Sequence, residues 1–168
     1  MIVLTTPISE ESIARLHVGD VVSISGYIYC ARDAVLPRIC KEIAEGIWER
    51  RDIDLQGSVI FHTAVSPAGV GPTSSNKLEI ESSIAPLSEA GVKLHLGKGA
   101  IKPETVKALD KNNSVFAIIP PVTALLESQT EARECIAFPE LGMEALYRIK
   151  VNNYQAIIAA AKGESIYE

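Results

Sequence analysis

The sequence predicts a layered α/β domain with a mixed sheet flanked by helices, and three observations support this fold class. Segments with the two-residue alternation of strands follow one another in turn with segments that carry a helical stripe, which is typical of α/β folds. The length of 168 residues suits one domain with a substantial core, so we expect residues 1–168 to form a single domain. The composition, 47% hydrophobic and 22% charged, is that of an ordinary globular protein.

The first half of the chain contains signals for two helices and two strands. In chain order we expect a helix at 9–16, a strand at 20–31, a helix at 32–51 and a strand at 58–65. Ser9 is a good N-cap, and the acidic residues that follow it suit the positive end of a helix dipole. Gly26 interrupts the alternating pattern of its strand and predicts a bulge there.

The second half continues the alternation. In chain order we expect a helix at 76–91, a strand at 92–97, a helix at 102–113, a strand at 114–120, a helix start at 121–128, and paired strands at 145–151 and 155–161. Asn76 and Glu79 have the spacing of a capping box, and Gly91 closes that helix. Pro103 stands near a helix start, where proline is tolerated. The turn-like NNYQ at 152–155 predicts a hairpin between the last two strands.

Charge and hydropathy exclude several partner classes. The net charge of -5 and the pI of about 5.3 argue against a nucleic-acid partner, which favours a basic face. The N-terminus lacks a basic region, and its apolar stretch breaks at Pro7, so no secretory signal is evident. The longest apolar stretch is short and contains two prolines, so we expect no membrane span. These features predict a cytoplasmic protein.

The three cysteines do not form a recognisable metal motif. Cys30, Cys40 and Cys135 are odd in number and have no CxxC spacing, which argues against a disulfide framework or a zinc site. Three cysteines could in principle hold an iron-sulfur cluster, but lone cysteines are usually small buried hydrophobes. We therefore expect buried structural cysteines, with a cluster ligand set as the alternative.

The stretch GVGPTSSNKLEIE at 69–81 has the features of an anion site. Its glycines permit close backbone approach, and the hydroxyls of Thr73, Ser74 and Ser75 converge with Lys77 on a predicted helix start. Free backbone N–H groups and the helix dipole favour an anion at such a position. The alternative is that these hydroxyls serve only as caps and turn formers.

Two other strand ends carry cations. Arg32 and Asp33 follow a predicted strand, and Lys98 stands in a glycine turn directly after another. The alternatives are a surface pair in which Asp33 caps the next helix, and a solvated lysine. If the strand ends converge, Arg32, Thr73, Lys77 and Lys98 line one carboxylate or phosphate pocket. His62, at a strand end near the glycine-rich stretch, is a further candidate for that pocket.

Five motifs together are similar to a known family. GDVVSISGYIYCARDA, GPTSSNK, LGKGAI, ELGMEALYRIKVNN and GESIY occur in this order between residues 19 and 167. They resemble the β subunit of class I fumarate hydratase and L(+)-tartrate dehydratase, a unit that also forms the C-terminal domain of single-chain class I fumarases. The resemblance implies a swivelling β/β/α domain of the class I fumarase C-terminal type.

The same resemblance implies a partner and a cofactor. In the family this domain pairs with an α subunit that carries a 4Fe-4S cluster, and one iron acts as a Lewis acid in the reversible hydration of a dicarboxylate. The cluster would then lie on the α subunit, and this chain would bind none. Homodimerisation of this chain is also open.

By motif match, the resemblance assigns roles to four residues. Arg32 of ARD and Lys98 of GKG would bind substrate carboxylates. Thr73 of GPT would bind substrate and act as the catalytic residue in proton abstraction. Lys77 stands where the family usually has an arginine, and a lysine keeps the charge without the two-bond fork. Asp33, Ser74 and His62 are additional pocket candidates.

Departures from the family pattern keep two functions open. Leu36 replaces a histidine, Lys77 replaces an arginine, Ala100 replaces a glycine, and the segment after His62 is short. The first hypothesis is a hydro-lyase β subunit, favoured by the retained Arg32, Thr73 and Lys98. The alternative is a catalytically inactive paralogue that acts as a carboxylate-binding or scaffolding domain.

Overall fold

The computed structural model describes residues 1–66, 69–73, 77–119 and 129–166, of which residues 64–66, 69–73 and 77–80 are described through their backbone only. Among these residues the strands are β1 (Ile2–Thr5), β2 (Val21–Ala31), β3 (Val59–Ser66), β4 (Gly69–Thr73), β5 (Leu94–Gly97), β6 (Val115–Ile118), β7 (Thr130–Ala137), β8 (Leu146–Ala161) and β9 (Glu164–Ser165). The helices are α1 (Glu10–Ala14), α2 (Leu36–Ala44), α3 (Lys77–Glu89) and α4 (Pro103–Lys111), and 3₁₀ turns lie at Trp48–Arg50 and Pro139–Glu144.

The strands form one mixed sheet, as predicted. Its order is β1-β2-β3-β5-β6-β8-β7, with β4 added to β3 and β9 added to β8. The first five of these strands run parallel, whereas β8 is antiparallel to β2, β6 and β7. Because β8 pairs with both β2 and β6, the strands β2, β3, β5, β6 and β8 close into a ring.

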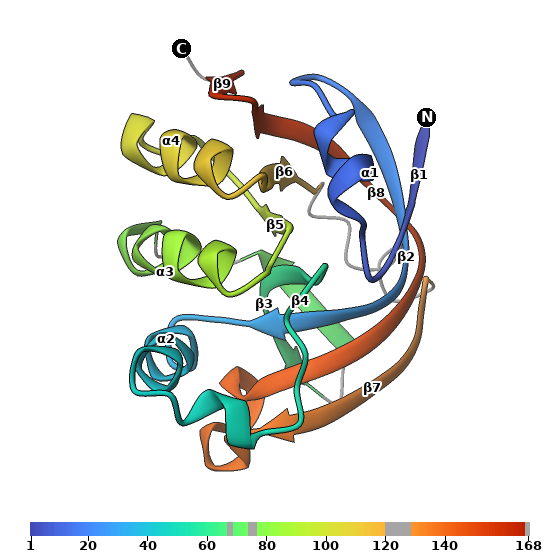
Figure 1. Ribbon diagram of the computed structural model, residues 1–168. Helices are drawn as coiled ribbons and strands as arrows, with labels where there is room; N and C mark the ends of the chain where they lie inside the picture. The colour runs from blue at the N-terminus through green and yellow to red at the C-terminus, as the bar shows by residue number, and fades with distance from the viewer. Residues whose placement is uncertain (67–68, 74–76, 120–128, 167–168) are drawn as a thin grey trace.

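The closed ring divides the interior into two cores. All five ring strands contribute to the first, which we call the barrel core; examples are Ile24, Phe61, Leu96, Ala117 and Tyr154. Helices α2, α3 and α4 pack on the opposite face of the sheet and form the second, which we call the helix-side core. In Figure 1 these three helices are stacked in one layer on the left, and the curved strands lie on the right. The fold is thus the layered α/β arrangement that the sequence predicts.

Several local predictions are confirmed. Ser9 caps α1, since its side chain accepts a hydrogen bond from the Ser12 N–H at 3.1 Å. The register between β2 and β8 shifts at Gly26, which has a φ of 110°. Pro103 is the first residue of α4. None of the helices in the described ranges has the length and apolar character of a membrane span.

The predicted hairpin at 152–155 is wrong, because β8 is one continuous strand from Leu146 to Ala161. Asn153 does have a left-handed φ of 55°, as a turn residue would. Between the pairs Ile24↔Tyr154 and Gly26↔Val151, β8 has the residues 152–153 where β2 has only Ser25, so Asn153 lies in a bulge of β8. The turn-forming residues therefore make a β-bulge within a continuous strand and do not reverse the direction of the chain.

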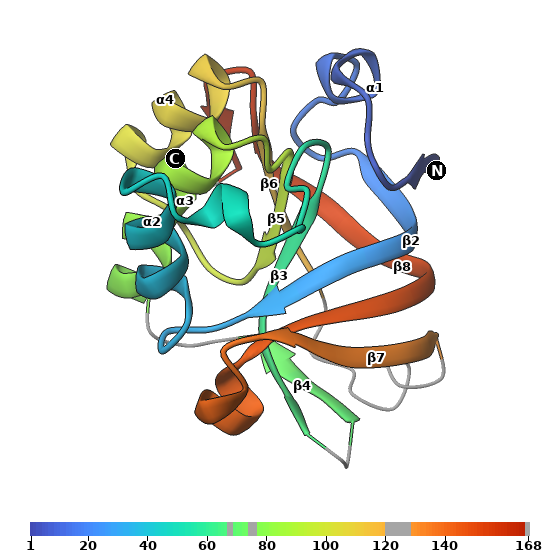
Figure 2. The same ribbon diagram turned by 60° about the horizontal axis from the view of Figure 1, so that its bottom comes forward.

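Other differences concern segments whose sequence pattern indicates their secondary structure only weakly. Strand β4 occupies the stretch interpreted as a glycine turn, and it pairs with β3 in a hairpin that projects from the sheet (Figure 2). Strands β1 and β7 were not predicted. The helix predicted over 32–51 is shorter, with α2 ending at Ala44. The helix start predicted at 121–128 lies outside the described residues.

Candidate carboxylate site

The carboxyl ends of the parallel strands place the predicted site residues at one edge of the sheet. Arg32 directly follows β2, and Lys98 directly follows β5. Between these strands lies β3, whose His62 pairs with Ala31 of β2. The carboxyl ends of adjacent parallel strands meet at the same edge, which is where α/β sheets bind ligands.

The glycine-rich stretch reaches the same edge. Thr73, at the end of β4, pairs with Thr63, the residue after His62. Lys77 is the first residue of α3. The backbone places Arg32 and Lys98 after β2 and β5, on either side of β3, with Thr73 paired to β3 and Lys77 at the start of α3. Ser74 lies outside the described residues, and a pocket shared by these side chains stays a prediction. Their roles in binding stay predictions.

The Arg32 loop is built into the start of α2. The Arg32 carbonyl accepts hydrogen bonds from the N–H groups of Val35 and Leu36, at 3.1 and 3.0 Å. Val35 occupies the N-cap position and makes no side-chain cap. The alternative in which Asp33 is the N-cap is therefore wrong, because the helix begins two residues later than that alternative requires. Arg32 and Asp33 are both half-buried.

The Lys98 loop depends on the glycines on either side of it. A Cβ on Gly97 would lie 3.1 Å from two ring atoms of Phe116, so a side chain there would require the ring to shift by a few tenths of an ångström. Gly99 has a φ of 77°, a conformation that favours glycine. Lys98 itself is exposed. The GKG sequence thus gives a tight turn that presents a lysine to solvent.

His62 lies beneath this edge and not on its surface. Its ring is fully buried and stacks on His95 of β5, with centroids 5.8 Å apart. Burial lowers the pKa of His62 to about 4. The pKa of His95 lies well below its usual value, mainly because the ring is buried and secondly because His62 is beside it. His95 Nε2 is 2.9 Å from Ser88 Oγ, but within the described residues His95 Nδ1 and both His62 ring nitrogens have no partner. Both histidines are therefore neutral at pH 7.

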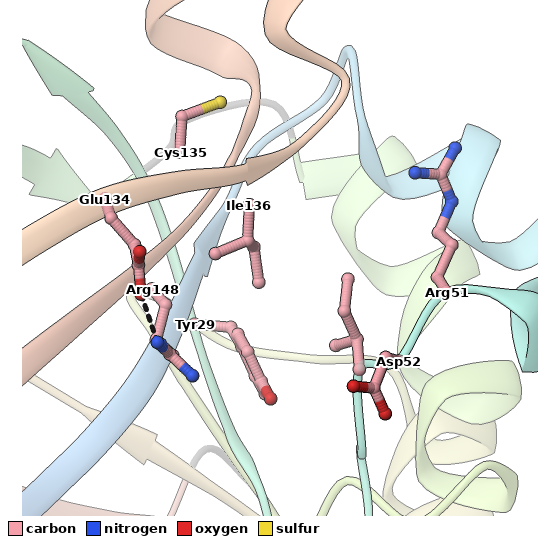
Figure 3. Close-up of a pocket in the computed structure, with 8 residues that line it drawn as sticks. Tyr29, Arg51, Asp52, Glu134, Cys135, Ile136 and Arg148 are labelled. Atoms are coloured by element: carbon pink, nitrogen blue, oxygen red, sulfur yellow. Dashed lines mark hydrogen bonds and ion pairs between the residues drawn. The ribbon is translucent and has the colours of Figure 1, made fainter.

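A separate cavity contains none of the predicted site residues. It has a volume of about 420 Å³ and is lined by Tyr29, Arg51, Asp52, Ile53, Glu134, Cys135, Ile136 and Arg148. Figure 3 shows Tyr29 and Arg148 from neighbouring strands beside this space, with Arg148 paired to Glu134. Arg51 is held by Glu42 through two hydrogen bonds. Sequence reasoning missed this cavity because it did not predict β7, which supplies one wall.

The cysteines lie on three different elements. Cys30 is buried in β2, Cys40 is half-buried in α2 and Cys135 is exposed in β7. No group of three or more potential metal ligands occurs within the ranges that the structure describes. These cysteines do not fit a cluster site, so no reaction step is assigned to a metal on this chain.

Comparison with known proteins adds a family and named relatives. The family described as "Fumarase C-terminus" matches residues 1–168. The L(+)-tartrate dehydratase subunit beta of Escherichia coli (strain K12) is 32% identical over 170 residues, covering 94% of this chain and 81% of the relative. A Methanocaldococcus jannaschii protein provisionally named L(+)-tartrate dehydratase subunit beta is 30% identical over 176 residues, covering 96% and 88%. A Geobacillus stearothermophilus protein provisionally named fumarate hydratase class I is 29% identical over 182 residues, covering 100% of this chain and 34% of that longer relative.

Proposed function

The chain belongs to the fumarase C-terminus family, and on that premise we propose that it is the β subunit of a hydro-lyase of the fumarate hydratase or tartrate dehydratase type. Its role in this proposal is to bind the carboxylates of a dicarboxylate substrate. The observation that carries the proposal is that Arg32 and Lys98 directly follow the parallel strands β2 and β5, which lie on either side of β3.

The proposed residues have complementary chemistry. The planar guanidinium of Arg32 can hold one carboxylate through two parallel hydrogen bonds. The backbone carbonyl of Arg32 is fixed to the start of α2. Lys98 supplies a point charge for a carboxylate from its exposed turn. Thr73 is proposed to contact the substrate and to take part in moving its proton. Neutral His62 lies below this edge and adds no charge to it at pH 7.

The partner in this proposal is an α subunit that carries a 4Fe-4S cluster. When bound there, the cluster would supply Lewis-acid chemistry toward the substrate hydroxyl. Two of the named relatives are β subunits, which supports a heteromer. We also propose a cytoplasmic location, supported by the free thiols of Cys30, Cys40 and Cys135, since such compartments keep cysteines reduced.

A second function is favoured by one specific observation. Leu36 is fully buried in the helix-side core, at a position where the resemblance implies a histidine. A leucine side chain can offer neither a hydrogen bond nor a proton to a substrate. A catalytically inactive paralogue that binds carboxylates or acts as a scaffold would tolerate this change.

The deciding experiment is anaerobic reconstitution with candidate α chains, followed by assays of fumarate, malate and tartrate. The β-subunit proposal expects activity only from the combined chains, and loss of activity in Arg32→Ala. Gel filtration of the chain alone would detect a homodimer. A stable complex with an α chain that binds dicarboxylate but turns over none of the three would favour the inactive paralogue.

A further inference from the structure

Two of the helices that start at the candidate site have no capping side chain of their own. The N-cap of α2 is Val35, and the N-cap of α4 is Lys102; neither makes a side-chain cap. The first N–H groups of a helix have no partner within the helix and carry the positive end of its dipole. The usual solution is an oxygen from the N-cap side chain.

At both helix starts a distant glutamate accepts a backbone N–H: that of the N-cap itself in α4, and that of the residue before the N-cap in α2. The Lys102 N–H donates to Glu81 Oε1 at 2.7 Å, and the Thr105 hydroxyl donates to the same oxygen at 3.1 Å. The Ala34 N–H donates to Glu144 Oε1 at 3.3 Å. A carboxylate is the acceptor that a helix N-terminus favours, because its charge complements the dipole.

Both glutamates act on loops that carry proposed substrate-binding residues. Ala34 is two residues beyond Arg32, whose own carbonyl is bound by the first turn of α2. Lys102 is four residues beyond Lys98, and its carbonyl accepts from the N–H groups of Thr105 and Val106. Fixing either helix start therefore also fixes the backbone next to one of the two cations.

The segment that delivers Glu144 is itself anchored on α2. The guanidinium carbons of Arg38 and Arg51 lie 4.6 and 4.3 Å from the centroid of the Phe138 ring. Glu140 pairs with Arg38 at 2.9 Å. Glu144 thus belongs to a segment that packs against α2, and its carboxylate accepts the Ala34 N–H just before the N-cap of that helix. Glu81 is likewise placed by the packing of α3 beside α4.

We propose that Glu81 and Glu144 are positioning residues that hold the Lys98 and Arg32 loops in the geometry required for carboxylate binding. This inference rests on the proposed function and names the internal anions that shape its site. The two glutamates do not touch the substrate. Glu81 accepts from the N-cap N–H of α4, and Glu144 accepts from the N–H just before the N-cap of α2. Both bonds restrict the loops before substrate arrives, so less conformational entropy is lost when Lys98 and Arg32 bind it.

The test compares alanine and glutamine variants in the complex with the α chain. Glu81→Ala and Glu144→Ala should each weaken dicarboxylate binding about two- to thirtyfold, the range that corresponds to loss of one helix cap. The value of KM should rise while kcat changes less than about twofold, because no group that acts in the transition state is removed. Glu81→Gln and Glu144→Gln keep an acceptor oxygen and should restore most of the affinity.

Amide hydrogen exchange gives a readout that does not depend on turnover. Exchange at Lys102 should accelerate in Glu81→Ala, and exchange at Ala34 should accelerate in Glu144→Ala, with little change elsewhere. The matched controls are Glu89→Ala, at the exposed end of α3, and Glu45→Ala, at the exposed end of α2. Both controls should retain affinity and exchange at the two loops.

Three outcomes would overturn the inference. If the parent complex binds dicarboxylate and the alanine variants bind it equally well, the glutamates do not position the loops. If the control variants lose as much affinity as the test variants, the effect is general destabilisation. If the parent complex binds no dicarboxylate, the proposed function itself fails and this inference fails with it. Should Glu144→Ala not fold, Glu144→Asp, which withdraws the carboxylate by one methylene, decides by the same readouts.

Discussion

The two cores on opposite faces of the sheet differ in what they bury. The barrel core is filled by aliphatic and aromatic side chains, and its Tyr154 hydroxyl reaches Thr130. The helix-side face buries His62, His95 and Ser88 among its apolar residues. Buried polar atoms without partners cost free energy, so the helix-side face gives up stability that the barrel core retains.

The difference follows the position of the candidate site. Parallel strands must be followed by helices that return along one face, so loops and helix starts gather at the carboxyl edge above the helix-side core. The barrel core has no such requirement and can be optimised for packing alone. We therefore expect packing stability and the proposed carboxylate binding to depend on opposite faces of one sheet, so substitutions in each face should have different effects.

The largest expected effect is the loss of stability on truncating the barrel core. Ile24 is fully buried, and Ile24→Ala should lower the free energy of unfolding by about 2–5 kcal/mol through lost burial and a residual cavity. Denaturant unfolding monitored by circular dichroism measures this change. Dicarboxylate affinity per folded molecule should stay unchanged. A large affinity loss in the folded fraction would show that the two faces are coupled.

The histidine pair should make the helix-side face sensitive to acid. Because the folded pKa of His62 is about 4 and its usual value is 6.5, the unfolded chain takes up the proton first as pH falls. Stability is therefore fully present above about pH 6.5 and is lost as pH falls toward 4, by roughly 3 kcal/mol for this one group. Unfolding free energies at pH 7 and pH 4.5 for the parent and His62→Gln measure the effect.

The control for that prediction is His17→Gln, because His17 is a surface histidine with 67% of its side chain exposed. The parent and His17→Gln should lose similar stability between the two pH values, whereas His62→Gln should lose less. Equal acid sensitivity in all three proteins would show that His62 does not dominate the pH dependence.

A smaller free-energy change, confined to binding, is expected at the edge of the helix-side face. Lys98→Ala should weaken dicarboxylate binding roughly ten- to a hundredfold, because a charge-assisted contact is lost. Unfolding should barely change, since Lys98 is exposed. Calorimetric titration of the complex with dicarboxylates measures the affinity. Retained affinity in Lys98→Ala would remove Lys98 from the site.

Sequence reasoning predicted the helix-side face better than the closed ring. The helices and central strands have strong periodicity, and the meeting of strand ends at one edge follows from parallel pairing. Strand β7 is exposed over most of its length and mostly polar, so no alternation marks it. Strand β4 contains two glycines and a proline, and it is a strand because β3 pairs with it. Closure of the ring depends on long-range pairing of β8 with β2, which no local pattern encodes.

The sequence alone identifies Arg32 and Lys98 as candidate cations of the site, but it does not identify the glutamates that bond to their loops. Arg32 and Lys98 stand directly after predicted strands, so their residue types and positions identify them. Glu81 acts on an amide 21 residues away, and Glu144 acts on one 110 residues away. A capping box is recognisable in sequence because its partners are three residues apart. Caps supplied across the fold carry no such signal, and only the packing of the helix layer reveals them.

The smallest expected effect concerns Lys77, the first residue of α3. By resemblance this position holds an arginine in the family, and arginine binds a carboxylate through two bonds where lysine offers a point charge. If the site is in use, Lys77→Arg should improve dicarboxylate affinity by about two- to tenfold, which is around 1 kcal/mol. The free energy of unfolding should change by less than about 0.5 kcal/mol, as for most substitutions that keep the charge.

Lys102→Arg is the matched control for Lys77→Arg, because Lys102 is an exposed lysine at the start of α4, beside the same edge. Titration of both variants in the complex should show a gain for Lys77→Arg and none for Lys102→Arg. Equal gains in the two variants would indicate a general electrostatic effect on dicarboxylates. If Lys77→Arg and Lys77→Ala both bind as the parent does, Lys77 serves only at a helix start. The helix-side face would then bind carboxylates through Arg32 and Lys98, and the inactive paralogue would gain support over the hydro-lyase subunit.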